Sequence, residues 1–92
     1  MASDNTLAML KASLGRPANV PDAVEQLLLQ ALNAAEQELQ GVGVILDDAQ
    51  PADAVLLVSY ASWLYKRDRT GAPRPDYLLR EIRDRQIKAV ST

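Results

Sequence analysis

The chain has 92 residues, a formal net charge of −2, and neither Cys nor His. A chain of this length has material for one modest core, so we expect residues 1–92 to form a single domain. Without Cys and His there can be no disulfide, no zinc–thiolate site, no thiol nucleophile and no histidine general base, so we expect a protein that is not an enzyme and holds no metal or cofactor.

Glycines and prolines divide the chain into four segments of helical apolar periodicity, which predicts an all-α, four-helix domain. The first helix is expected over residues 4–14, capped by Ser3 or Asp4 and ended by Gly15. The N-terminus of the sequence lacks the basic stretch and apolar core of a signal peptide. No apolar run approaches the roughly 20 residues of a membrane span. We therefore expect a protein made in the cytoplasm without a membrane partner.

The second helix is expected over residues 22–40. Asp22 and Glu25 have the spacing of a capping box, and Gly41 suits a left-handed residue just past the helix end. Leu29 falls off the apolar face and is taken as a candidate contact with a partner. The residues expected on the core face are Val24, Leu27, Leu28, Ala31, Leu32, Ala35 and Leu39.

A short extended connector, or a single short strand, is expected over residues 42–46. The third helix follows over residues 51–68, with Pro51 at its first position. Its apolar residues cover most of the circumference and leave Ser59, Ser62 and Lys66 as the polar stripe. A helix that is apolar nearly all round must be covered nearly all round, so we expect a central helix with one flank covered by another copy of the chain.

The fourth helix is expected over residues 75–88, with a thin apolar face and several arginines. Residues 1–57 carry a net charge of −6 and residues 58–92 a net charge of +4. Such charged faces are ordinarily solvated, but this separation also suits acidic and basic surfaces that meet between copies.

Two other readings of the charged residues are weaker. Asp47, Asp48 and Asp53 lack the alternating pattern of a calcium loop, and acids here suit the start of the third helix. The basic run from Lys66 to Lys88 suggests nucleic acid, but the chain is acidic overall and the link before residue 75 is long for a helix-turn-helix.

Trp63 is expected in the core, whereas Tyr65 suits either the core or an interface.

Residues 53–75 read Asp-Ala-Val-Leu-Leu-Val-Ser-Tyr-Ala-Ser-Trp-Leu-Tyr-Lys-Arg-Asp-Arg-Thr-Gly-Ala-Pro-Arg-Pro, and Leu-Leu-Arg follows at 78–80. This stretch resembles the head–tail connector (head-completion adaptor) family of tailed bacteriophages. The most specific part is the segment Ser-Tyr-Ala-Ser-Trp-Leu-Tyr-Lys-Arg, and the resemblance extends loosely over residues 22–86.

The resemblance implies a structural virion protein of the neck region. Copies would form a homo-oligomeric ring that joins the portal protein at the capsid vertex to the tail or stopper protein, with DNA passing through the channel. The alternatives are a small phage-encoded helical DNA-binding or regulatory protein, and an accessory subunit of an enzyme. The candidate protein-interface residues are Leu29, Tyr65, Lys66, Arg67, Arg69, Arg74, Arg80 and Arg83.

Overall fold

The computed structural model describes residues 3–47 and 50–91, with residues 89–91 described by their backbone alone. The described residues form no strand and four α-helices, which confirms the expected all-α, four-helix domain. The helices are α1 (Asp4–Ser13), α2 (Asp22–Gly41), α3 (Pro51–Thr70) and α4 (Asp76–Ser91).

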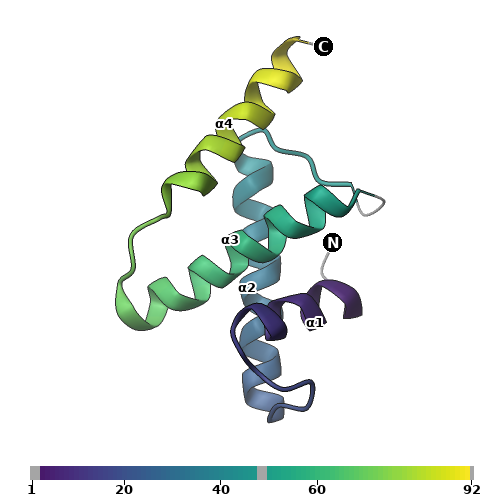
Figure 1. Cartoon of the computed structure of the whole chain (residues 1–92), viewed down its shortest axis with the longest axis vertical. Helices are drawn as coiled ribbons and strands as arrows, with labels where there is room; N and C mark the ends of the chain where they lie inside the picture. Colours follow the sequence, from purple (N-terminus) through teal and green to yellow (C-terminus); the bar gives the residue numbers. More distant parts are fainter. Residues whose placement is uncertain (1–2, 48–49, 92) are drawn as a thin grey trace.

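The helices cross one another in two layers rather than forming a parallel bundle (Figure 1). In that view α2 lies behind, and α3 and α1 cross it in front. The helix α3 packs against each of the other three, so it is the centre of the domain as expected. The far end of α4 projects beyond the other helices (Figure 1), and the molecule measures 44 × 30 × 19 Å along its principal axes.

Two of the helix starts are built differently from one another. Ser3 caps α1 in a reciprocal box with Thr6: its hydroxyl accepts from the Thr6 amide at 3.3 Å, and the Thr6 hydroxyl accepts from the Ser3 amide at 2.9 Å. The capping box expected at Asp22 is wrong, because Pro21 is the cap residue and makes no side-chain bond. Glu25 instead accepts from the ammonium of Lys11 at 3.1 Å.

The glycine that ends α2 is not the expected one. Gly41 is still helical, and Gly43 takes the left-handed conformation at φ +88°. Residues 42–47 then run to α3 without forming a strand, with Val44 buried as their anchor. The helix α3 continues to Thr70, past the expected end at residue 68, and Gly71 caps it at φ +69°.

The chain itself covers most of α3, so less of this helix is left for another copy to cover than its apolar circumference indicated. Ser62 belongs to the buried side rather than to a polar stripe, because α1, α2 and α4 together surround the helix. The largest apolar side chain of α3 left in solvent is Val55, which is 54% exposed. The buried residues of α3 are Asp53, Ala54, Leu56, Leu57, Val58, Tyr60, Ala61, Ser62, Trp63, Leu64 and Tyr65.

The apolar face of α2 is rotated relative to the expectation. Leu27, placed on the core face from the periodicity, is 42% exposed. Leu29, placed off that face, is half-buried and packs against the core. Leu29 is therefore part of the fold rather than a free partner contact.

Candidate functional site

Two arginines lie on the single tryptophan near the end of α3. The guanidinium carbons of Arg67 and Arg74 lie 5.0 Å and 4.9 Å from the Trp63 ring centroid. The Trp63 indole N–H donates to the carbonyl of Ala72 at 3.0 Å, which ties the link after α3 back onto the helix. Trp63 is buried, as expected for a core residue. The rings therefore fix where these two charges stand on the surface.

Tyr65 gathers two further arginines. The guanidinium carbon of Arg69 lies 3.7 Å from the Tyr65 ring centroid, and Arg16 donates from Nη2 to the Tyr65 hydroxyl at 3.2 Å. Tyr65 itself is only 7% exposed, which favours the core among the two places, core or interface, that the sequence left open for it. Arg16 was not among the candidates, because nothing local in the sequence relates it to a tyrosine 49 positions away.

Tyr60 links the aromatic residues of α3 to α2. Its ring meets Trp63 edge-on, with centroids 5.4 Å apart at 84°. Its hydroxyl donates to Glu38 Oε1 at 3.2 Å. Burial, together with the negative charge of Glu38, raises the pKa of Tyr60, so the phenol stays protonated at neutral pH.

A buried ion pair fastens α4 to the start of α3. The guanidinium of Arg85 donates to Asp53, which also accepts from the backbone amide of Asp47 at 2.8 Å. Glu81 pairs with the other side of Arg85 at 2.9 Å. Burial alone would raise the pKa of Asp53, but the bonds from Arg85 and Asp47 outweigh it and lower the pKa. The bond to Asp53 likewise raises the pKa of Arg85.

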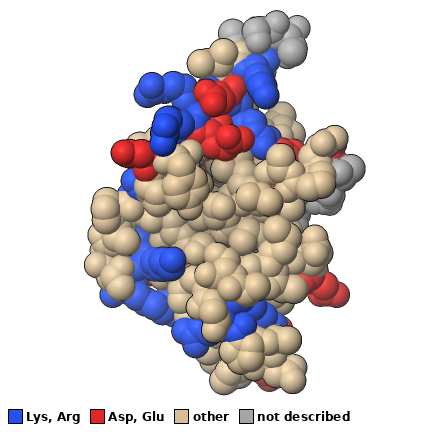
Figure 2. Space-filling view, viewed as in Figure 1, with Lys and Arg blue, Asp and Glu red and all other residues tan. Residues whose placement is uncertain are grey.

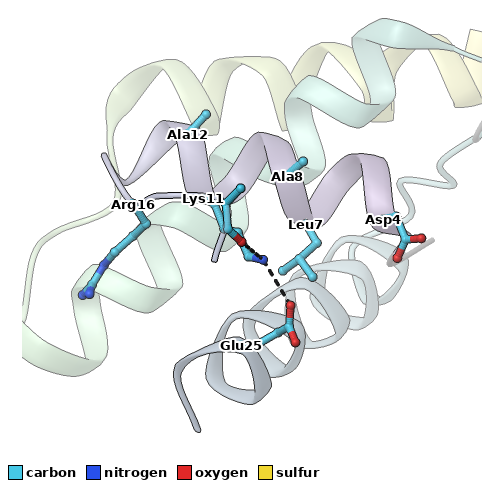
Figure 3. A pocket seen from close by; sticks show the side chains of 8 residues that line it. Asp4, Leu7, Ala8, Lys11, Ala12, Arg16 and Glu25 are labelled. Carbon is cyan, nitrogen blue, oxygen red and sulfur yellow. Dashed lines mark hydrogen bonds and ion pairs between the residues drawn. The ribbon is translucent and has the colours of Figure 1, made fainter. Parts of the chain in front are cut away.

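A second ion pair closes the groove between α1 and α2, shown in Figure 3. Lys11 points from α1 toward α2 and donates to Glu25 at 3.1 Å and to the carbonyl of Ala18 at 2.9 Å. The groove has a volume of about 380 Å³, with Asp4 at one end and Arg16 pointing away from the ion pair (Figure 3). The Lys11 contacts brace the α1–α2 loop and are satisfied within the chain, so we read this groove as structural.

The groove between α3 and α4 is a largely apolar hollow in which exposed side chains gather. It has a volume of about 380 Å³ and is lined by Ala52, Val55, Leu56, Ser59, Tyr77, Leu78 and Glu81. Val55 and Tyr77 are each more than half exposed. Figure 2 shows one face of the molecule, whose centre is free of charged side chains, while Lys and Arg gather over the end of α3 and, mixed with Asp and Glu, over α4.

The structure separates the expected interface residues into two basic surfaces. Lys66, Arg67, Arg69 and Arg74 are exposed around the end of α3, and Arg80 and Arg83 are exposed on α4. Within the described chain, Arg67 alone of these six has a carboxylate within ion-pair distance, at 3.6 Å from the exposed Asp68. Leu29 and Tyr65 belong instead to the packed interior.

The described residues contain no group of three or more acidic side chains that could hold a metal ion. Asp53 is committed to Arg85, and Asp48 lies outside the described residues. Within the described chain, no helix is both long enough and apolar enough to cross a bilayer.

Comparison of the chain with protein-family models, curated proteins and solved structures finds no match. The resemblance to the head–tail connector family therefore stays a prediction.

Proposed function

We propose that this chain is a structural, non-enzymatic adaptor of a tailed bacteriophage. Copies of it assemble head to tail into a ring that joins the portal vertex to the tail or stopper and extends the DNA channel. The protein acts in the neck of the virion. No reaction is part of this role, which agrees with a chain that lacks Cys and His.

The observation that carries the proposal is that one copy has two unlike surfaces. A closed head-to-tail ring needs two different, mutually complementary patches on each copy. One surface is the largely apolar groove between α3 and α4, with Glu81 in its lining and Asp76 next in the sequence to the groove residue Tyr77. The other is the basic end of α3, where rings hold Arg67 and Arg74 in place. A second copy whose basic end meets this acid-bordered groove would satisfy both surfaces.

The resemblance in residues 53–75 supports the proposal in a second way. Three residues of this stretch, one of them in its most specific segment, hold α3 to its neighbours. Asp53 binds Arg85, Trp63 binds Ala72, and Gly71 makes the left-handed turn. The recognisable stretch is therefore the part of the sequence that fixes both proposed surfaces.

The test is to mix the purified chain with its cognate portal protein and image the product by electron microscopy. The expected result is a ring of this chain on the portal. Val55→Asp should prevent ring formation, because it places a charge in the groove without touching the core. Ile45→Asp is the matched control, since Ile45 is 84% exposed in the connector and lies outside the groove. If the wild-type chain leaves the portal bare, the proposal is wrong. If Val55→Asp formed rings as well as the wild-type chain, the groove would have no part in ring assembly.

A second candidate function is a small DNA-binding or regulatory protein. The observation in its favour is that α4 carries the exposed Arg80 and Arg83 directly after a five-residue link at 71–75, which is shorter than the sequence indicated. Duplex binding by the isolated chain, with a steep salt dependence that Arg80→Gln with Arg83→Gln removes, would support it. A chain with a net charge of −2 makes this the weaker candidate.

A further inference from the structure

The contacts of Tyr65 bring together donors without an acceptor. Arg16 comes from the α1–α2 loop and donates to the Tyr65 hydroxyl at 3.2 Å. Arg69 comes from the end of α3 and lies over the face of the same ring at 3.7 Å. No carboxylate of the described chain lies within ion-pair distance of either guanidinium. The two guanidiniums, which both contact Tyr65, repel each other, so an anion bound between them would relieve this repulsion.

Tyr65 adds a third donor to this set. A phenol hydroxyl has one proton to donate besides the lone pairs with which it accepts. In the described chain the Tyr65 hydroxyl accepts from Arg16 and has no acceptor for its own proton. The hydroxyl proton is thus available beside two guanidiniums.

The role of Arg69 in the helix does not explain the whole arrangement. Arg69 donates to the carbonyl of Tyr65 at 3.2 Å, as expected for a basic residue that stabilises the end of a helix. Arg16 has no such role, because it belongs to another segment and reaches α3 through the tyrosine hydroxyl alone among its described contacts. Its position costs side-chain entropy, against which the described contacts of Arg16 set a single part-buried hydrogen bond.

The directions of the donors favour a phosphate over a carboxylate. Arg69 lies above the ring face, whereas Arg16 and the hydroxyl proton lie at the ring edge. The lone pairs of a carboxylate lie in one plane, whereas the oxygens of a phosphate point to the corners of a tetrahedron and accept from several planes at once. A hollow of about 220 Å³ lies beside Tyr65 and Arg69 and has room for such a group, with Arg16 outside its lining. Its lining also contains Gln30, Arg67 and one carboxylate, Asp68, which lies 3.6 Å from Arg67.

We propose that Arg16, Tyr65 and Arg69 form a site for a phosphate group of a nucleic-acid backbone. The exposed Lys66 beside it extends the positive surface toward neighbouring phosphates. The inference deepens the proposed function, since a ring around passing DNA needs a face that meets the backbone, and it rests on that function for the source of the DNA. All three residues of the site belong to one copy of the chain, so the site does not require the ring.

The experiment uses the isolated full-length chain, labelled with nitrogen-15 and followed by amide NMR. Inorganic phosphate is titrated at constant ionic strength against chloride, and shifts are expected in residues 14–18 and 63–71. Tyr65→Phe keeps the ring under Arg69 but removes the hydroxyl, and it should weaken phosphate binding by about 3- to 10-fold, as expected for one hydrogen bond. Arg16→Gln with Arg69→Gln should abolish binding. Arg80→Gln with Arg83→Gln, which removes the same number of charges from α4, should leave it within about 2-fold.

A second arm uses a fluorescent 20-base-pair duplex at increasing salt. Removing Arg16 and Arg69 should lower the slope of log affinity against log salt by about one to two, whereas the α4 double variant should not change the contribution of this site. A glutamate-rich peptide serves as the competing class of ligand. Stronger binding of that peptide than of phosphate or duplex at Tyr65 would overturn the inference in favour of an acidic protein partner.

Absence of phosphate-induced shifts around Tyr65, or phosphate binding that Tyr65→Phe and the Arg16/Arg69 double variant leave intact, would also overturn it. Circular dichroism spectra of the variants show whether each is folded. Tyr65→Phe keeps the inference testable if the double variant does not fold. The portal experiment needs no phosphate binding, so failure of this site and failure of the proposed ring are separate results.

Discussion

Neutralising Asp53 should loosen α4 from the rest of the domain. In the folded chain its carboxylate is 7% exposed and accepts from both Arg85 and the amide of Asp47. The substitution Asp53→Asn keeps the shape and one acceptor oxygen for Asp47 but removes the charge opposite Arg85. Few other contacts hold α4: Leu78 and Ile82 are buried, and Gln86 donates to the carbonyl of Val42 at 2.6 Å.

The expected cost follows from the contact that is lost. A hydrogen bond to a charged group contributes about 1.5–3 kcal/mol, and Asn presents a donor where Arg85 needs an acceptor. Arg85 keeps Glu81 and some contact with water, which limits the loss. We therefore expect Asp53→Asn to lower the free energy of unfolding by about 2 kcal/mol at pH 7. For a domain of this size, that corresponds to a fall of about 8–16 °C in Tm.

The same ion pair predicts how stability depends on pH. The pKa of Asp53 is lowered by folding from its ordinary value of 3.8. The carboxylate therefore stabilises the fold fully above that ordinary value, and this contribution is lost as the pH falls through the lower pKa of the folded state. The difference in unfolding free energy between the wild-type chain and Asp53→Asn should consequently shrink as the solution is acidified below about pH 4.

Urea denaturation followed by circular dichroism at pH 7 and pH 3 measures both effects, and amide hydrogen exchange shows whether the loss is concentrated in α4. Glu81→Gln is the matched control, because Glu81 contacts the same guanidinium but its side chain is 45% exposed. An exposed pair of this kind contributes at most about 0.5 kcal/mol. Equal losses in Asp53→Asn and Glu81→Gln, or a difference that does not change with pH, would show that burial of Asp53 does not make this pair important.

Three further predictions test the packing. Leu28→Ala should lower the free energy of unfolding by about 2–5 kcal/mol in urea denaturation because Leu28 is fully buried, whereas Leu27→Ala on the exposed side should cost less than about 1 kcal/mol. Similar costs for the two would mean that the face of α2 is misplaced. Gly71→Ala should lower the Tm measured by circular dichroism, with a loss of about 1 kcal/mol, since φ is +69° at that position and the space around it is open; an unchanged Tm would argue against the left-handed turn. Arg74→Gln should cost about 0.5–1 kcal/mol and change the fluorescence of Trp63, and unaltered emission would argue against the stacked contact.

The helices themselves could be predicted because their signals are local. Apolar periodicity, Pro51 at the start of α3, and the glycines and prolines between segments place all four helices to within a few residues. The phase of α2 was harder, because an apolar face that must meet both α1 and α3 allows more than one rotation of the helix. Leu27 and Leu29 exchanged places for that reason.

The surfaces were less predictable because they depend on pairs of residues far apart in the chain. Lys11 with Glu25, Arg16 with Tyr65, and Asp53 with Arg85 leave no periodic signal. The uncovered apolar surface on α3 was overestimated for the same reason, because the sequence does not show which distant helices cover it. Composition shows how apolar a helix is, but the crossing of the other helices decides how much of it their own chain covers.

The aromatic rings at the end of α3 give the basic surface there its particular character. A carboxylate would hold an arginine in place but would also neutralise it, whereas a ring holds the guanidinium and leaves its charge in full. Arg16, Lys66, Arg67, Arg69 and Arg74, against Asp68 alone, give this end a net charge of +4 in a chain of net charge −2. Because the guanidiniums are already ordered, an anionic partner would find less side-chain entropy to remove on binding. If Tyr65→Phe weakened phosphate binding, and Arg74→Gln weakened ring assembly, by more than their effects on stability explain, these ring-held contacts would serve recognition in addition to folding.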